Sequence, residues 1–479
     1  MNKPIIIAIG FIIISVSFYW FATGHLIRPF ALIIGAFYIA LLFTNITNFM
    51  SVWIIASPIV NWYLYRYADP AGLNAITLRE ILDFDRMSIL AAFMYLKISG
   101  FAKIRTNSKT RLTVLNFPII LFIASMTWSC LFKSYNDMNA LKITFDAIII
   151  PFMLIIISRD IFTTPETFNK LIRVFVLLSL YLVILGAFEL IYTGNVFRRI
   201  RWPFVFWETY GFTLSILFTV IMFVYFTRIR VGIKESIFNR YGYLMILMIL
   251  GVFFTLTRAA WLTLFSGTIF FLHNSSKIIK NPLKKWVFGG SAVIAIILTT
   301  VMVVLPSSIT ESDIYKRRVS NQSTLDNRFQ TFEFAFDQIK KYPITGIGFR
   351  NFRDYYGLHY DFTKDTRASN PGRSTLHSLY INILTEQGIL GLSLFIIVII
   401  KIMSKTRVFI FDLNTNVKLW GYLGISTIII YLISGILYDP LFDPPYFVTK
   451  LSFIIFGTFY TKDRNFIKSF SLYYNSKNK

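Results

Sequence analysis

The sequence has 479 residues, of which 55% are hydrophobic and only 15% are charged, and its formal net charge is +24 at pH 7. A soluble domain carries roughly a quarter charged residues and a disordered chain has low hydrophobicity, so the composition excludes both classes. The apolar runs are long and unbroken, which also argues against the alternating strands of an outer-membrane barrel.

Apolar runs long enough to cross a bilayer, about 20 residues each, recur along the chain. They predict an all-α, polytopic transmembrane helical bundle with about 12–14 spans, at 4–22, 29–45, 48–65, 82–100, 112–131, 141–158, 172–192, 208–226, 240–257, 259–273, 286–306, 380–403, 419–437 and 444–461. The first run has no small-residue cleavage site behind it, so we interpret it as a span rather than a signal peptide. The stretch 241–272 is too long for one crossing, so we expect the chain to turn near Arg258.

Basic segments orient these spans. They fall on one side of the predicted membrane, at 97–111, 227–240, 274–285, 401–418 and the tail 462–479. The positive-inside rule makes that side the cytoplasm, which places both termini there and explains the net charge without nucleic acid. The predicted organisation is an N-terminal transmembrane bundle (1–306), a large external loop (307–376), C-terminal transmembrane helices (377–461) and a basic cytoplasmic tail (462–479).

The external loop contains an amphipathic segment. Within 323–341, Phe329, Phe332, Phe336 and Ile339 recur at helical spacing, and Pro343 ends the pattern. We expect this helix to lie on the membrane or to cap the bundle. A glycine turn, Gly346-Ile347-Gly348, follows it.

Arginines on the external side break the positive-inside pattern. Arg201 lies in a loop between two spans, Arg258 lies at the external end of a helical hairpin, and Arg328 lies in the amphipathic segment. An arginine between apolar stretches is costly unless it is paired, and a guanidinium matches a phosphate bidentately. Together these arginines predict a phosphorylated lipid ligand, although loop solvation would explain any one of them alone.

His377 is the candidate general base. It precedes a predicted span, and Ser374 is a plausible N-cap that would put His377 in the first helical turn. The positive end of a helix disfavours the imidazolium, and a neutral imidazole can accept a proton. The alternative is an interfacial histidine that only packs, and His25 and His359 are external as well.

The remaining polar motifs are weaker. Asp83-Phe84-Asp85 resembles the DxD pair that binds a metal and a sugar nucleotide, but such tripeptides are common by chance. Asp439 and Asp443, in YDPLFDPPY, are interpreted first as turn residues. We expect no cofactor and no metal site, because the sequence has no phosphate-binding loop, no Cys/His cluster and a single cysteine, Cys130.

Three stretches occur in order in the second half of the chain: LTRAAWLTL (256–264), NRFQTFEFAFDQIKKYPITGIGFRNF (327–352) and LHSLYINILTEQGILGL (376–392). After many spans, this order of an arginine, a large external loop and a histidine resembles the O-antigen ligase and polymerase family of bacterial envelope glycan assembly. The resemblance covers about 50 residues and implies a protein of the bacterial cytoplasmic (inner) membrane.

The resemblance implies a glycosyltransferase. Its donor would be an oligosaccharide on a polyprenyl diphosphate, and its acceptor a glycan hydroxyl at the external face. In this chemistry Arg258 and Arg328, with Arg201 as a weaker candidate, would bind the diphosphate in place of a metal, His377 would take the proton, and the anomeric centre would be inverted. A chain-length regulator and a flippase would be further partners, besides the lipid bilayer.

Within the family, the Tyr- and Phe-rich external loop, which could stack on sugar rings, and Ser378 after the histidine favour a polymerase of surface polysaccharide repeat units. The alternative is a ligase that transfers the glycan to a lipid A core. A lipid-linked oligosaccharide flippase is a third hypothesis, but transporters usually show paired halves and charged residues in the middle of spans, neither of which the sequence indicates. A membrane glycosyltransferase with an acidic site at 66–86 is a fourth.

Overall fold

The computed structural model describes residues 27–67, 84–104, 117–133, 137–193, 200–204, 206–230, 240–278, 322–359, 376–439 and 446–460. Within these ranges every regular element is a helix, which confirms the predicted all-α fold. The predicted spans 4–22 and 286–306 lie outside the described residues. The four-part division of the chain remains a prediction, because the boundaries at 306/307 and 461/462 and parts of the predicted external loop also lie outside them.

The helices follow the predicted apolar runs closely. In chain order they are α2 (Ile27–Thr44), α3 (Ile46–Tyr67), α5 (Phe84–Ile104), α6 (Phe117–Lys133), α7 (Asp137–Thr144), the π-helical turn η1 (Phe145–Ile149), α8 (Ile150–Ile161), α9 (Pro165–Thr193), α10 (Trp207–Arg230), α11 (Arg240–Phe254), α12 (Arg258–Ser275), α16 (Gln322–Lys341), α17 (Phe352–His359), α18 (Leu379–Ile410), α19 (Thr415–Leu437) and α20 (Phe447–Phe459). Among the described residues, five segments are long and apolar enough to cross a membrane: Ala140–Ile161, Pro165–Thr193, Trp207–Ile229, Leu379–Ile410 and Thr415–Ile436. The chain is therefore a multi-pass membrane protein.

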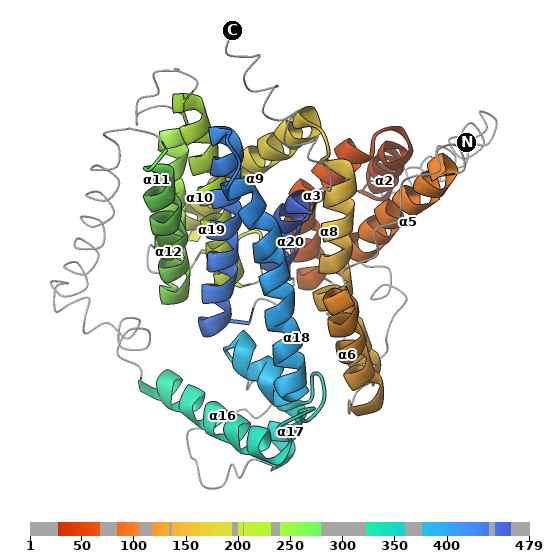
Figure 1. The fold of residues 1–479 in the computed structure, drawn as a ribbon, viewed down its shortest axis with the longest axis vertical. Helices are drawn as coiled ribbons and strands as arrows, with labels where there is room; N and C mark the ends of the chain where they lie inside the picture. The colour runs from red at the N-terminus through yellow and green to blue at the C-terminus, as the bar shows by residue number, and fades with distance from the viewer. Residues whose placement is uncertain are drawn as a thin grey trace, which may run out of the picture.

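The long helices form one bundle, with α19 and α20 near its centre (Figure 1). α19 packs against α10, α12 and α18, and α20 packs against α8. The N-terminal helices α2, α3 and α5 lie on one side of the bundle, and α11 and α12 lie on the opposite side. Close helix crossings depend on small residues: a Cβ on Gly267 of α12 would lie 2.5 Å from Ile430 of α19. Such close approach is the usual basis of helix association in membranes.

Two shorter helices lie beyond one end of this bundle. α16 runs crosswise below the long helices in Figure 1, with α17 beside it. α16 follows the predicted phenylalanine pattern and ends at Lys341, two residues before Pro343. Ala335 of α16, Ile347, and Phe352 and Tyr356 of α17 share a small apolar core with Leu376. We call this end of the molecule the α16 end.

Candidate functional site

Arg258 lies at the turn between α11 and α12, where the sequence predicted a turn. α11 ends at Phe254 and α12 begins at Arg258. Leu256 adopts a left-handed backbone conformation with φ of 51°, which costs a non-glycine residue about 1–3 kcal/mol. The Thr257 amide donates to Thr255 Oγ1 at 3.3 Å, and Thr257 Oγ1 donates to the Thr255 carbonyl at 3.1 Å. These bonds hold the strained turn that leaves Arg258 exposed at the start of α12.

Arg201 lies beside this turn, and a buried carboxylate holds its backbone. Glu189, in the last part of α9, accepts the amides of Arg201 and Trp202 on Oε2 at 2.7 and 2.8 Å. The preceding residue, Ile200, donates its amide to the carbonyl of Phe254 at the end of α11, at 3.3 Å. The structure therefore brings the segments of Arg201 and Arg258 together, and the sequence analysis missed the role of Glu189.

His377 lies at the start of α18, but not where the sequence placed it. The helix begins at Leu379 with Ser378 as its N-cap, and Ser378 makes no side-chain capping bond. The prediction that Ser374 caps the helix and that His377 lies in its first turn is therefore wrong. His377 precedes the N-cap and is partly exposed, and Ser378 beside it is buried.

A buried polar pair joins the start of α18 to the end of α19. Asn382 Nδ2 donates to Asp439 Oδ2 at 2.6 Å, and the two residues are 6% and 3% exposed. Asn382 Oδ1 has no hydrogen-bond partner within the described part of the chain. Asp439 was interpreted first as a turn residue, yet the structure buries it against Asn382, which follows His377 by five residues in the chain. Asp443 lies outside the described residues.

At the α16 end, the start of α10 contacts both α12 and the end of α19. Thr209 Oγ1 and the hydroxyl of Tyr438 are 3.4 Å apart, and the rings of Phe212 and Tyr438 are 5.2 Å apart. A Cβ on Gly211 of α10 would lie 2.6 Å from Cβ of Ala260 in α12, so these helices cross closely beside Arg258. The starts of α10, α12 and α18 and the end of α19 thus converge, and they carry Arg258 and His377 to the same end of the bundle.

A clamp fixes α16 and α17 to this end. Gly388 interrupts α18 with φ of 64°, and there the helix exposes backbone groups to the glycine turn. The amides of Ile347 and Gly348 donate to the carbonyls of Thr385 and Glu386 at 3.0 and 2.9 Å. In return, the amides of Ile389 and Leu390 donate to the carbonyls of Pro343 and Ile344 at 2.9 and 3.2 Å.

Side chains reinforce the clamp. The Glu386 carboxylate accepts the amides of Arg350 and Phe352 at 2.8 and 3.2 Å, at the beginning of α17. Lys133 Nζ, at the end of α6, donates to Thr345 Oγ1 at 2.6 Å, and Asn351 Nδ2 donates to the Lys133 carbonyl at 2.5 Å. The glycine turn is therefore held by both α6 and α18, which indicates a structural role.

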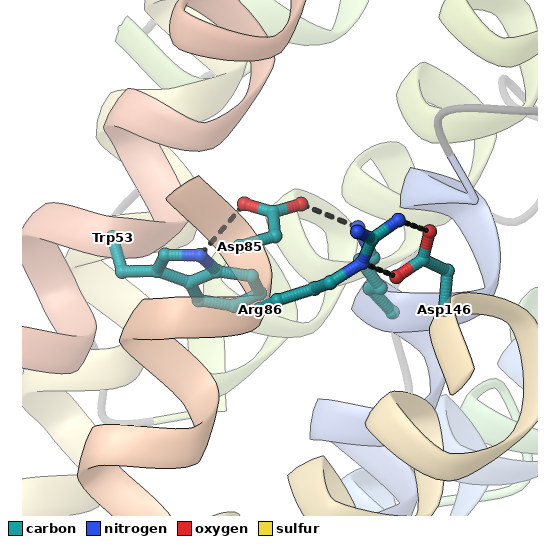
Figure 2. Close-up of polar contacts among 5 residues, drawn as sticks. Trp53, Asp85, Arg86 and Asp146 are labelled. Atoms are coloured by element: carbon teal, nitrogen blue, oxygen red, sulfur yellow. Dashed lines mark hydrogen bonds and ion pairs between the residues drawn. The ribbon is translucent and has the colours of Figure 1, made fainter. Parts of the chain in front are cut away.

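The structure does not describe every predicted site residue. Arg328 lies in α16, but its side chain is outside the described set, as is that of His359, and His25 and Asp83 are not described at all. Asp85 does not support the DxD interpretation. Its two oxygens contact Trp53 Nε1 at 2.9 Å and Lys450 Nζ (Figure 2).

Residues 243–396 match the family model described as O-Antigen ligase. The match begins in α11 and ends in α18, so it contains the turn of Arg258, the whole of α16, the clamp to Gly388 and His377. All three stretches that suggested the resemblance lie inside it. No curated protein matches the chain.

Proposed function

We propose that this chain, whose residues 243–396 match the O-antigen ligase family model, transfers an oligosaccharide from a polyprenyl diphosphate to an acceptor sugar hydroxyl at the external face of the bacterial cytoplasmic membrane. Glycosyl transfer follows from the family. The identity of the donor, the catalytic and diphosphate-binding residues and the external location go beyond the family match and are part of the proposal. It is supported above all by the convergence of the Arg258 turn and His377 at one end of the bundle.

Arg258 is suited to hold the donor diphosphate. It is the first residue of α12, where the helix dipole is positive, so its charge opposes the dipole rather than complementing it. A bound anion would be attracted by both the guanidinium and the amides of the helix start. Arg201 would contribute a second cation from the adjoining segment, and Arg328 a third from α16.

His377 is suited to accept the proton of the acceptor hydroxyl. It is partly exposed and precedes the positive end of α18, which disfavours the imidazolium. In the reaction the hydroxyl oxygen bonds to the anomeric carbon, the bond from that carbon to the phosphate oxygen breaks, and the proton passes to His377. The polyprenyl diphosphate leaves with its negative charge held by the arginines. Direct attack inverts the anomeric centre without a metal ion.

The exposed face of α16 fits the membrane interface. Phe329 and Phe336 of α16 and Ile344 are exposed. Ile344 accepts a hydrogen bond from the amide of Leu390 at the α18 break, where Ile389 and Leu390 are exposed too, so exposed apolar residues of the two segments are neighbours. An interfacial α16 would hold the loop at the depth of the carrier diphosphate.

Deletion of the gene tests the proposal. Polymerisation of surface polysaccharide is favoured, so we expect single repeat units to remain at the surface and long chains to disappear. Long chains that persist on the lipid carrier without reaching a lipid A core would make the protein a ligase instead. Repeat units that accumulate in the cytoplasmic leaflet would indicate a flippase and contradict the proposed chemistry.

A further inference from the structure

Four charged side chains form two ion pairs inside the bundle, away from His377 and Arg258. Asp85 accepts a hydrogen bond from Trp53 Nε1 and pairs with Lys450 Nζ, and Figure 2 shows the neighbouring Arg86 reaching toward Asp146. Arg86 binds Asp146 bidentately, with Nε and Nη2 at 2.5 and 2.6 Å from the two carboxylate oxygens. We call these five residues the buried ion network.

The burial of the buried ion network is unusual for charged residues. Asp85, Lys450, Arg86 and Asp146 are 0%, 3%, 8% and 9% exposed. The absence of charge in the middle of the spans was one argument against a flippase, and the four charged residues of the network lie in the first halves of three predicted spans, 82–100, 141–158 and 444–461. The network contains two cations and two carboxylates, however, so it has no net charge to offer a transported ion.

Stability alone does not account for such a network. Removing paired charges from water costs about as much as their attraction returns, so buried pairs contribute chiefly to the specificity of packing. Apolar helices in lipid also have little hydrophobic preference for one register over another. A buried ion network defines one register among α3, α5, η1 and α20.

The backbone around Asp146 is itself irregular. Pro151 has no amide to donate within the continuous helix 137–161, and the Ile150 amide donates instead to the carbonyl of Phe145, five residues back. The resulting π-helical turn contains Asp146. π-Helical turns occur often at functional sites, because the extra residue redirects the side chains around it.

The buried ion network reaches the candidate site through α20. Lys450 lies in the first turn of this helix, which begins after Tyr446 in a left-handed conformation with φ of 58°. Phe447, one turn before Lys450, packs on Phe204 with 5.4 Å between ring centroids. The Phe204 amide donates to the carbonyl of Arg201 at 2.6 Å. The start of α20 therefore supports the segment that carries Arg201.

We propose that Asp85 and Lys450 are positioning residues that fix the start of α20 and, through Phe447 and Phe204, hold the Arg201 segment in place at the α16 end. The benefit for catalysis rests on the proposed function, since Arg201 is a proposed diphosphate ligand. The positional claim stands apart from it. None of these residues lies within 243–396, so this support comes from outside the segment that matches the family.

The test measures the accessibility of position 201 without any substrate. Cys130 is the single cysteine and is buried, so Cys130→Ala with Arg201→Cys gives one reporter thiol. Maleimide labelling of this thiol is timed in native membranes of the full chain. In the double variant Asp85→Asn with Lys450→Met, which leaves no orphan charge, we expect the labelling rate to change by about threefold or more.

Two controls define the comparison. Neutralising the more exposed pair of α8, with Arg159→Gln and Asp160→Asn, should leave the rate at position 201 unchanged. A reporter at Tyr243→Cys, exposed on α11, should label equally in both backgrounds. Unchanged labelling at position 201 in the double variant would overturn the proposal.

If the variant Asp85→Asn with Lys450→Met does not insert into the membrane, a milder substitution provides the test. Trp53→Phe preserves an aromatic ring and removes only the indole donor to Asp85, so a smaller change in the same direction is expected, and no change overturns the proposal. Activity is measured separately with lipid-linked oligosaccharide extracted from the deletion strain. An inactive parent enzyme with altered labelling in the network variants would contradict the proposed function and leave the positional claim supported.

Discussion

Two arginines at helix starts show how this chain uses the same residue in opposite ways. Arg86, near the start of α5, is buried, and its guanidinium is matched by the carboxylate of Asp146. Arg258, the first residue of α12, is exposed beside a strained turn at the α16 end. The guanidinium of Arg86 is paired with a carboxylate inside the bundle, whereas Arg258 is exposed at the surface. The comparison teaches that the position of an arginine in the fold, rather than its presence in an apolar sequence, decides whether its side chain is buried or exposed.

The largest effect is expected at His377, which lies at the same end of the bundle as the exposed Arg258. His377→Ala should reduce glycan transfer by about 10²–10⁴-fold, because a positioned base contributes that much to the rate. His273→Ala is the matched control, since His273 is exposed at the opposite end of α12 and should tolerate the change. The measurement is polysaccharide chain formation in cells with equal amounts of each variant in the membrane. Normal chains with His377→Ala would remove the base assignment.

Arg258 is expected to show the next largest effect. Arg258→Ala should lower transfer by about 10²-fold, through loss of charge stabilisation on the departing diphosphate. Arg258→Lys should recover part of it, because the charge remains but the bidentate geometry is lost. Arg240, the first residue of α11 and also exposed, provides the control Arg240→Lys. Full activity of both Arg258 variants in the same assay would argue against a phosphate site.

The clamp should matter for structure more than for chemistry. Gly388→Ala would place a Cβ 2.3 Å from the backbone of Ile344 at a φ of 64°, which should destabilise the protein by about 1–3 kcal/mol. Gly357→Ala is the matched control, because nothing lies within 4 Å of its added Cβ. Thermal unfolding in detergent and proteolysis within 342–349 measure the effect. Equal stability of the two variants would mean that the clamp contributes little.

The smallest expected effect is that of metal removal. If the arginines carry the charge of the diphosphate, chelation by EDTA should change transfer by less than about twofold. The assay uses protein in proteoliposomes with the extracted lipid-linked oligosaccharide. A loss of activity that added magnesium restores would show that the arginines do not replace a divalent ion.

Local patterns predicted the elements of this fold well. An arginine interrupting a long apolar stretch predicted the turn between α11 and α12, and the spacing of phenylalanines predicted α16 and its end before Pro343. Both signals are local, since they depend on residues that are neighbours in the chain. The N-cap of α18 was misplaced by four residues, because a serine pattern alone does not distinguish Ser374 from Ser378.

Long-range partners could not be predicted in the same way. Lys450 and Asp85 are 365 residues apart, and Asn382 and Asp439 are 57 apart. The sequence around Asp439 favoured a turn over a role in a site, and nothing in the sequence around Glu386 and Gly388 indicated that they bind the glycine turn. These contacts arise from helix packing, and a single sequence records the packed faces but not which faces meet.

The most direct measurement of the central claim is the release of polyprenyl diphosphate by the purified protein in proteoliposomes. The substrate is the lipid-linked oligosaccharide extracted from the deletion strain, and the parent enzyme is compared with His377→Ala and His273→Ala. We expect the parent and His273→Ala to release polyprenyl diphosphate and form an inverted glycosidic bond, and His377→Ala to do neither at a comparable rate. Equal release by His377→Ala, or no release by the parent, would contradict the account.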